Sequence, residues 1–317
     1  MKKETNLGLD YQIKPFMFRY LVGKEHLEFR TQKQQDACEY LIHLLKADYK
    51  VATLSRGYKR KTKGFQLADK NATAETIGDE PFQFYSKFKN EILVAVDANR
   101  CDGIQSLLHE NPEVILLDDA YQHRKVKAGF NIMLTTYNNL FVHDMLLPTG
   151  DLREPKKGAN RANVIVVTKC PEDITEAQKQ DIVKAIKPKT NQTLFFSSIV
   201  YSRKLKTLNN EIELKSLKDK EFTLVTGIAD ASPLVNYLKS QDFNFEHLIF
   251  GDHHDFSSKE IEVLQSKKLI ITTEKDFMRL NKRVKNNLYY LPIEVKLNDQ
   301  EMFERLIKNY LSTVKQQ

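Results

Sequence analysis

The sequence lacks any apolar stretch approaching the roughly 18 residues that a membrane-spanning helix requires. Residues 1–12 also lack the apolar core of a secretory signal. Cysteine is scarce: Cys38, Cys101 and Cys170 are odd in number, far apart and outside any C-x-x-C spacing. Disulfide frameworks and structural zinc sites are therefore not expected, and the sequence predicts a cytoplasmic protein.

Internal repeats and linkers rich in Gly, Pro or Ser are also absent from the 317 residues. Apolar residues make up 41% and charged residues 29%, which is typical of a globular protein and excludes a disordered, collagen-like or coiled-coil chain. The net charge of +7 and the pI near 9.0 favour an anionic partner such as a phosphate, a nucleic acid or an acidic membrane surface. No nucleic-acid motif or stacking platform accompanies the basic residues, so we expect no nucleic-acid partner.

Short β-branched runs alternate with amphipathic stretches along the chain. This alternation predicts βαβ units, and hence an α/β fold with a mostly parallel sheet covered by helices on both faces. The expected strands are 51–54, 92–96, 114–117, 131–134, 164–168, 194–197, 222–226, 248–250, 269–272 and 288–291, and the expected helices are 37–45, 177–185, 232–240 and 258–265. A polar stretch around Asn209 and Asn210 predicts a hairpin. We place a domain boundary just before it, with a core domain at residues 1–200 and a smaller α/β domain at residues 201–317.

The expected strand at 114–117 ends in two carboxylates, Asp118 and Asp119. Ligands of open α/β sheets bind beyond the carboxyl ends of the strands, and Mg²⁺ accepts one or two carboxylates while keeping several waters. The pair is therefore a candidate magnesium site, with Gln122 and His123 as candidate contacts to a substrate hydroxyl or phosphate. The alternative is that one Asp caps a following helix.

A second acidic pair lies in Gly-Asp-Glu-Pro at residues 78–81. The glycine permits a tight turn, the proline favours a helix start, and the helix dipole favours carboxylates there. The functional interpretation makes Asp79 a general base and Glu80 a ligand of metal or water. An ordinary helix N-terminus is the alternative.

Consecutive histidines follow the expected strand at 248–250, in the order Asp252, His253, His254, Asp255. An imidazole flanked by carboxylates is suited to proton transfer. Zinc is disfavoured because no cysteine or H-x-x-x-H spacing lies nearby.

Two further segments are more ambiguous. Arg56 follows the strand at 51–54 and is suited to bind a phosphate, whereas the basic run at 59–63 is better explained as a solvated loop. Thr273 and Asp276 have the spacing of a helix capping box.

Taken in order, eight segments resemble the tetraacyldisaccharide 4'-kinase family of lipid A biosynthesis. They are LSRGY at 54–58, GDEP at 78–81, LDDAYQHR at 117–124, LLPTGDLREP at 146–155, VVTKCP at 166–171, VTGIAD at 225–230, FGDHHDF at 250–256 and TTEKDFMRL at 272–280. The resemblance extends from about residue 37 to the end of the chain.

The resemblance implies a P-loop kinase type of sheet and ATP-dependent, Mg²⁺-assisted phosphorylation of the 4'-hydroxyl of a tetraacylated glucosamine disaccharide 1-phosphate. It also implies peripheral contact with the cytoplasmic face of the inner membrane, and it suggests no protein partner. By position, Asp79 matches the family's catalytic base and His253 the histidine that supports it. Glu80, Asp118 and Asp119 match acidic metal-site residues. The motifs near the sugar and phosphate groups contain Arg56, Tyr58, Gln122, His123 and Arg153.

One feature of the family is missing, namely the G-x-x-x-x-G-K-[ST] loop that precedes the helix at 37–45. No glycine occurs between Gly23 and Gly57, and a phosphate-binding loop requires backbone conformations that largely need glycine. Lys33 is retained as a candidate phosphate contact. The family's apolar N-terminal helix has a counterpart only in residues 13–22, which are expected either to touch the membrane or to pack on the domain. An alternative function is therefore a catalytically impaired family member that binds acylated sugar phosphate.

Overall fold

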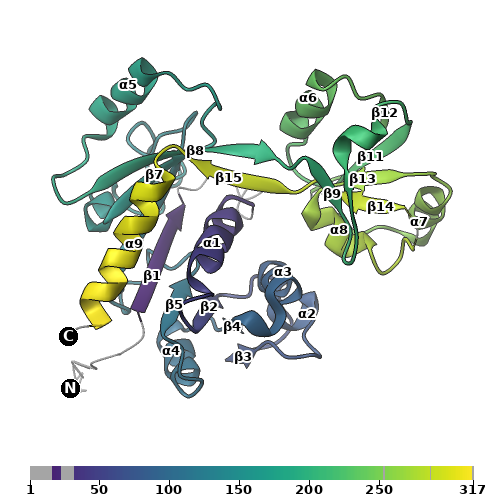
Figure 1. Ribbon diagram of the computed structural model, residues 1–317. Helices are drawn as coiled ribbons and strands as arrows, with labels where there is room; N and C mark the ends of the chain where they lie inside the picture. Colours follow the sequence, from purple (N-terminus) through teal and green to yellow (C-terminus); the bar gives the residue numbers. More distant parts are fainter. Residues whose placement is uncertain (1–15, 23–31, 253, 286, 316–317) are drawn as a thin grey trace.

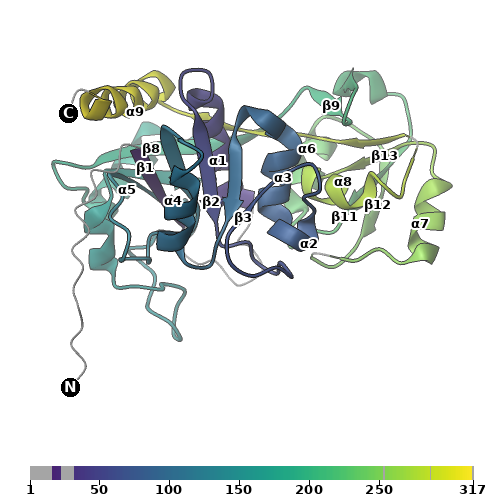
Figure 2. The same cartoon turned by 90° about the horizontal axis from the view of Figure 1, so that it is seen from below.

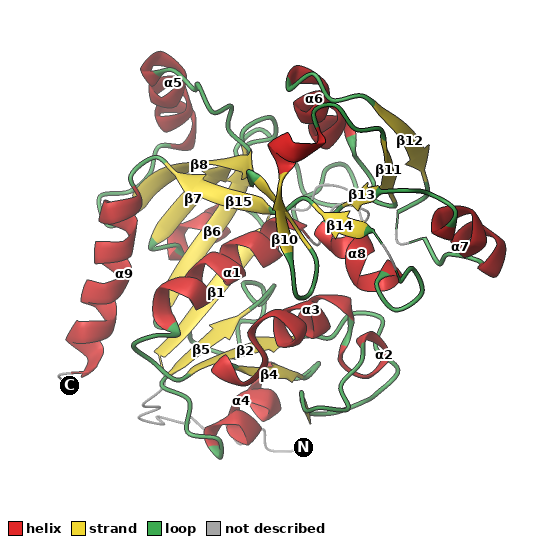
Figure 3. Ribbon diagram, turned by 45° about the vertical axis from the view of Figure 1, so that its right-hand side comes forward, coloured by secondary structure: helices red, strands yellow, loops and turns green. Residues whose placement is uncertain are grey.

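The computed structural model describes residues 16–22, 32–252, 254–285 and 287–315. Within these ranges the chain forms two mostly parallel sheets with helices packed against them (Figures 1 and 3). The prediction of an α/β fold is therefore confirmed. The first sheet has the strand order β15-β8-β7-β6-β1-β5-β2-β4-β3, and the second has the order β10-β9-β14-β13-β11-β12.

The strands of the first sheet are parallel except at its two edges, where β3 and β15 run antiparallel to their neighbours. They are β1 (Phe16–Val22), β2 (Val51–Ser55), β3 (Gln66–Leu67), β4 (Leu93–Val96), β5 (Val114–Leu117), β6 (Phe130–Thr136), β7 (Val164–Thr168), β8 (Thr193–Tyr201) and β15 (Ile293–Leu297). Both β2 and β5 are buried along their whole length, because helices cover both faces. Full burial explains why these strands are continuously apolar in sequence.

Helices of the first sheet bury apolar side chains against both of its faces. They are α1 (Gln32–Leu45), α2 (Ala74–Ile77), α3 (Asp79–Phe88), α4 (Arg100–Leu108), α5 (Glu176–Ile186) and α9 (Gln300–Lys315), with short 3₁₀ segments at Lys89–Glu91 and Lys156–Arg161. The largest core cluster joins Leu41 and Ile42 of α1 to Ile307 and Leu311 of α9. Helices α1 and α9 therefore pack on the same core of the first sheet (Figure 3).

The second sheet contains β9 (Lys204–Lys206), β10 (Glu211–Glu213), β11 (Phe222–Thr226), β12 (Phe245–Ile249), β13 (Ile270–Thr272) and β14 (Leu288–Tyr290). Its helices are α6 (Ser232–Ser240), α7 (Ser258–Gln265) and α8 (Glu274–Leu280), with a 3₁₀ segment at Leu214–Leu217. Strands β9 and β10 pair antiparallel, which confirms the hairpin expected around Asn209 and Asn210. The strand expected at 248–250 is displaced toward the N-terminus, as β12.

The last segment of the chain, which follows the second sheet in sequence, belongs to the first sheet (Figure 1). Strand β15 pairs antiparallel with β8. Helix α9 packs Phe303 edge-on against Phe195, with ring centroids 5.2 Å apart. The second sheet is thus an insertion between β8 and β15, and the domain expected at residues 201–317 does not coincide with it. The boundary near residue 200 itself stays a prediction.

Strand β1 lies in the middle of the first sheet, parallel to both β5 and β6. Of the two alternatives for residues 13–22, membrane contact or packing on the domain, this pairing supports packing on the domain for residues 16–22. Residues 13–15 lie outside the described part. A central strand followed along the chain by α1 has the strand-to-helix order of a P-loop protein. The connecting residues 23–31 lie outside the described part, as does the side chain of Lys33, which belongs to the first turn of α1. None of the described helices has both the length and the apolar character needed to cross a membrane.

Candidate active site

Two glycines bring the Leu-Ser-Arg-Gly-Tyr and Gly-Asp-Glu-Pro segments together at the carboxyl end of β2. Gly57 and Gly78 both have positive φ angles, +65° and +95°. A Cβ on Gly78 would lie 3.1 Å from the Tyr58 carbonyl oxygen, and one on Gly57 would lie 2.9 Å from the carbonyl oxygen of Ile77. The two segments therefore lie backbone against backbone, and this contact places Asp79, at the start of α3, beside the loop that carries Arg56.

Replacing Gly57 by Ala is expected to lower the free energy of unfolding by about 2–4 kcal/mol. The new Cβ would overlap neighbouring atoms, and an alanine would be strained in the left-handed backbone conformation. Gly64 supplies a matched control, since its φ is +67° but a Cβ there would meet nothing within 4 Å. Gly64→Ala should cost only about 1–2 kcal/mol. Urea denaturation of the two variants measures the difference. Equal losses would show that the contact between the two segments contributes nothing.

The paired carboxylates Asp118 and Asp119 follow β5, which lies between β1 and β2. The Asp118 backbone N–H donates to the Leu54 carbonyl at 3.2 Å, and the Asp118 residue is only 5% exposed. Asp119 takes a left-handed conformation with φ of +44°. Residues 118–126 form turns and bends rather than a helix. The helix-capping alternative is therefore wrong for this pair.

Burial and mutual repulsion perturb the acidic side chains at this edge of the sheet. Burial and, after it, the Asp119 charge raise the pKa of Asp118 to about 7, and Arg100 and a backbone N–H oppose the shift. The pKa of Glu80 is raised well above its ordinary range by desolvation, then by Asp118 and Asp119, although Lys275 opposes the shift. Glu80 on α3 therefore lies within electrostatic range of the carboxylates that follow β5.

Two oxygens of this acidic group suit a hard cation. Asp118 Oδ1 and Asp119 Oδ1 are buried and have no hydrogen-bond partner within the described residues. Buried carboxylate oxygens are normally paired, so these two are suited to accept a cation. The described ranges contain no preassembled group of three or more metal-ligating side chains. Mg²⁺ does not need such a group, because it keeps several waters and binds one or two carboxylates.

Two arginines donate hydrogen bonds to the acidic pair. Arg100, at the start of α4, is 3% exposed and donates from Nη2 to the Asp118 carbonyl at 3.2 Å. Arg153 Nη1 donates to Asp119 Oδ2 at 3.1 Å, which ties the Leu-Arg-Glu-Pro segment to the site. Sequence reasoning missed Arg100. The available signal was its position just after β4, at the same edge of the sheet.

The remaining predicted residues surround this group less tightly. Arg56 is exposed, and its charge helps to lower the pKa of Arg100, although burial is the main cause of that shift. Tyr58 is 56% exposed. Gln122 and Arg153 line one small pocket, and His123 is half-buried. His253 lies outside the described residues.

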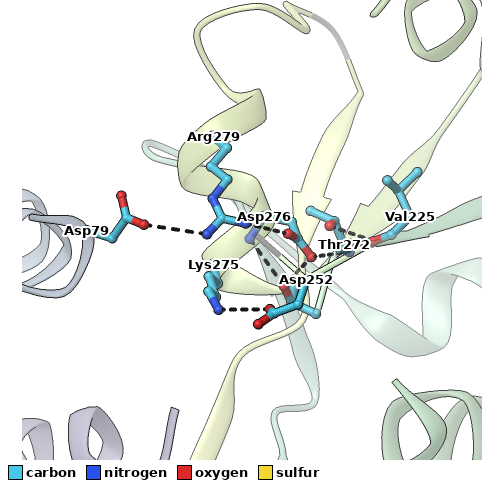
Figure 4. A network of polar contacts seen from close by, with 9 residues as sticks. Asp79, Val225, Asp252, Thr272, Lys275, Asp276 and Arg279 are labelled. Carbon is cyan, nitrogen blue, oxygen red and sulfur yellow. Dashed lines mark hydrogen bonds and ion pairs between the residues drawn. The ribbon is translucent and has the colours of Figure 1, made fainter. Parts of the chain in front are cut away.

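Helix α8 of the second sheet carries two cations that pair with carboxylates (Figure 4). Arg279 Nη2 lies 3.6 Å from Asp79 Oδ2, and Lys275 Nζ lies 3.3 Å from Asp252 Oδ1. Thr273 caps α8 by accepting from the Asp276 N–H, which confirms the N-cap half of the predicted capping box. The sequence did not identify Lys275 or Arg279 as site residues, because a helix capping box was a sufficient explanation of the segment that contains them.

Comparison with known proteins identifies the family. A profile described as tetraacyldisaccharide-1-P 4'-kinase matches residues 37–312. The chain belongs to this family. The tetraacyldisaccharide 4'-kinase of Flavobacterium johnsoniae is 50% identical over 280 residues, covering 86% of this chain and 82% of that protein. The one from Phocaeicola vulgatus is 44% identical over 296 residues, covering 86% and 81%.

A solved family structure supports the same assignment. LpxK from Aquifex aeolicus, crystallised in complex with ATP, matches with a TM-score of 0.73 and 27% identity, covering 94% of this chain and 89% of that chain. The match confirms the prediction of a P-loop kinase type of fold.

Proposed function

We propose that the protein transfers the γ-phosphoryl group of ATP to the 4'-hydroxyl of a tetraacylated glucosamine disaccharide 1-phosphate. The observation that carries this proposal is the convergence of Glu80, Asp118 and Asp119 beside the exposed Asp79, with two carboxylate oxygens that have no hydrogen-bond partner among the described residues. The relatives named above are tetraacyldisaccharide 4'-kinases, which supplies the substrate class.

Asp118 and Asp119 would hold Mg²⁺, with Glu80 as a further ligand of the metal or of its waters. A bound Mg²⁺ neutralises negative charge on the transferring phosphoryl group. Arg153 orients Asp119 through their hydrogen bond, and Arg100 fixes the backbone of Asp118. These contacts hold the two carboxylates in place before a ligand arrives.

Asp79 would accept the proton of the sugar hydroxyl. It lies in the first turn of α3, where the helix dipole favours its ionised form, and its side chain is 51% exposed, so a substrate can approach it. His253 is proposed to support this base. Arg56, Tyr58, Gln122, His123 and Arg153 are proposed to contact the sugar and its phosphate.

The decisive experiment is incubation of the purified chain with ATP, Mg²⁺ and the tetraacyl disaccharide 1-phosphate. The expected product carries a new phosphate at the 4' position. Absence of this product from well-folded protein would refute the proposal.

The glycine-free stretch between Gly23 and Gly57 is the observation behind the alternative of a catalytically impaired member. ATP titration separates the two cases. Tight binding that is weakened by Lys33→Ala supports an active kinase in which Lys33 contacts a phosphate. Binding of the acylated substrate without any measurable ATP binding would support the alternative.

We also propose peripheral contact with the cytoplasmic face of the inner membrane, through the loop between β6 and β7. Met145, Leu146 and Leu147 are 57%, 45% and 47% exposed. The loop is held in shape: Asp144 Oδ1 accepts from the backbone N–H groups of Met145 and Asp151 at 2.7 Å and 3.0 Å. Three consecutive exposed apolar side chains on a hydrogen-bonded loop are suited to insert into a lipid interface.

Basic residues at the base of this loop suit an anionic membrane surface. Lys156 Nζ donates to the Val142 carbonyl at 2.6 Å, and Lys157 is exposed beside it. Among the acids of this segment, Glu154 is paired with Arg161 at 2.7 Å. The same chain segment continues to Arg153 at the acidic site, so a docked loop would bring the site to an acylated substrate.

Replacing Met145, Leu146 and Leu147 together by Ser is expected to lower sedimentation with vesicles containing anionic lipid by about tenfold or more, because roughly 1.5–3 kcal/mol of burial is lost per side chain that inserts. Turnover of substrate dispersed in detergent should change little. The matched control replaces Leu208 and Ile249, which are 62% and 72% exposed elsewhere. Equal losses from both sets would show that the loop has no special role.

A further inference from the structure

Helices α3 and α8 meet across the two sheets, and the proposed base lies in that contact (Figures 2 and 4). Arg279 of α8 lies 3.6 Å from Asp79 of α3. Glu274 lies 3.4 Å from Lys87 at the other end of α3. Lys282 lies over the ring of Phe82, 5.9 Å from its centroid. These three contacts join α3 to α8 and to the turn that follows α8, and only the Arg279 contact among them involves Asp79.

The guanidinium of Arg279 is held by a buried carboxylate. Its Nη1 lies 3.5 Å from Oδ1 of Asp276, which is fully buried. Asp276 Oδ2 in turn accepts from the Gly227 backbone N–H and from Thr273 Oγ1, both at 2.8 Å. A Cβ on Gly227 would lie 2.9 Å from Asp276 Oδ1, so the glycine is needed for this close approach. The cation that faces Asp79 is therefore fixed to the end of β11.

Repulsion from the acidic group does not by itself fix the rotamer of Asp79. Its side chain is 51% exposed, and the carboxylates of Glu80, Asp118 and Asp119 all lie on its own side of the contact. Like charges repel, and an exposed side chain retains several rotamers. A fixed guanidinium on the opposite side selects the rotamers that point toward α8.

We propose that Arg279 is a positioning residue that orients Asp79 for proton transfer, so that the base is completed only when both sheets contribute. The inference rests on the proposed function, because it assigns Asp79 the role of base. It adds a residue of the second sheet that acts through Asp79 rather than on the substrate. The Asp79–Arg279 pair is partly exposed and contributes little to stability. Asp276 keeps its hydrogen bonds from Gly227 and Thr273 when Arg279 is replaced, so the loss of Arg279 should affect turnover more than folding.

The test compares Arg279→Gln, Arg279→Lys and the control Lys282→Gln in the 4'-phosphorylation assay. Arg279→Gln should lower kcat about 10- to 100-fold with KM for both substrates nearly unchanged, because the oriented base acts in the transition state. Arg279→Lys should restore a large part of the loss, since it keeps the charge. Lys282→Gln weakens the same α3–α8 contact without touching Asp79 and should leave kcat within about twofold. Unchanged kcat in Arg279→Gln, or an equal loss in Lys282→Gln, overturns the inference.

A crystallographic comparison separates this inference from the proposed function. The wild type, with and without nucleotide, should keep the Asp79–Arg279 contact, and Arg279→Gln should show a different Asp79 rotamer. An inactive wild type that keeps this contact and loses the rotamer in Arg279→Gln would refute the proposed function but support the positioning. An active wild type in which Asp79 points away from Arg279 in both crystals would refute the positioning alone.

Discussion

Asp79→Asn is expected to lower kcat by about 10²- to 10⁴-fold, the usual contribution of a general base. The amide keeps the size and the exposed position of the side chain but cannot accept the hydroxyl proton. KM for the acylated sugar should change little, because proton transfer matters only in the transition state. Steady-state phosphorylation at saturating ATP measures both quantities.

The control for Asp79→Asn is Glu75→Gln, which removes a carboxylate from the adjacent helix α2. Glu75 is exposed and pairs with Lys61 at 2.8 Å, away from the acidic group. Its loss should leave kcat within about twofold, as expected for a surface ion pair. Equal losses of substrate binding and turnover in Asp79→Asn would remove this residue from the catalytic role.

Asp118→Asn should abolish Mg²⁺-dependent turnover and yet stabilise the fold at pH 8. Burial raises the folded-state pKa of Asp118 from 3.8 to about 7. A carboxyl whose pKa is raised on folding favours the folded state while protonated. Its stabilising contribution is complete below about pH 4 and is lost as the pH rises through about 7. At pH 8 the charged group therefore costs up to about 4 kcal/mol, which the neutral amide avoids.

The measurement is the melting temperature of wild type and Asp118→Asn at pH 4 and pH 8, with and without Mg²⁺. The difference between the proteins should be large at pH 8 and small at pH 4. Added Mg²⁺ should raise the melting temperature of the wild type, because only the folded wild type binds it, and should leave the variant unchanged. A variant that is less stable than the wild type at pH 8 would contradict this account of the site.

The strand ends explain how much of the site could be predicted from sequence. Asp118 and Asp119 follow a continuously apolar run, and parallel strands place such residues at one edge of the sheet. Glu80 lies near them because Gly57 and Gly78 bring their two segments into contact. The sequence suggests a turn at each glycine but does not indicate that the two turns meet. The position of Glu80 beside the acidic pair therefore rested on the family resemblance until the electrostatics supported it.

Other features could not be predicted because a local pattern admits two structures. Residues 16–22 include Arg19 among apolar residues, which is typical of an amphipathic segment at a surface. The structure instead pairs this segment, as β1, between β5 and β6. Arg279 follows a segment that a helix cap explains fully, and its contact with Asp79 joins residues far apart in the chain. Long-range contacts of this kind depend on how the two sheets meet, which periodicity does not encode.

The return of β15 and α9 to the first sheet has a consequence for biosynthesis. Phe303, Ile307 and Leu311 are each at most 4% exposed and fill the core beside α1. A nascent chain that has already built β1 to β8 still leaves that apolar surface open while the ribosome translates the whole inserted sheet. Since exposed apolar surface promotes aggregation of folding intermediates, chaperone protection during translation should matter most before α9 has left the exit tunnel.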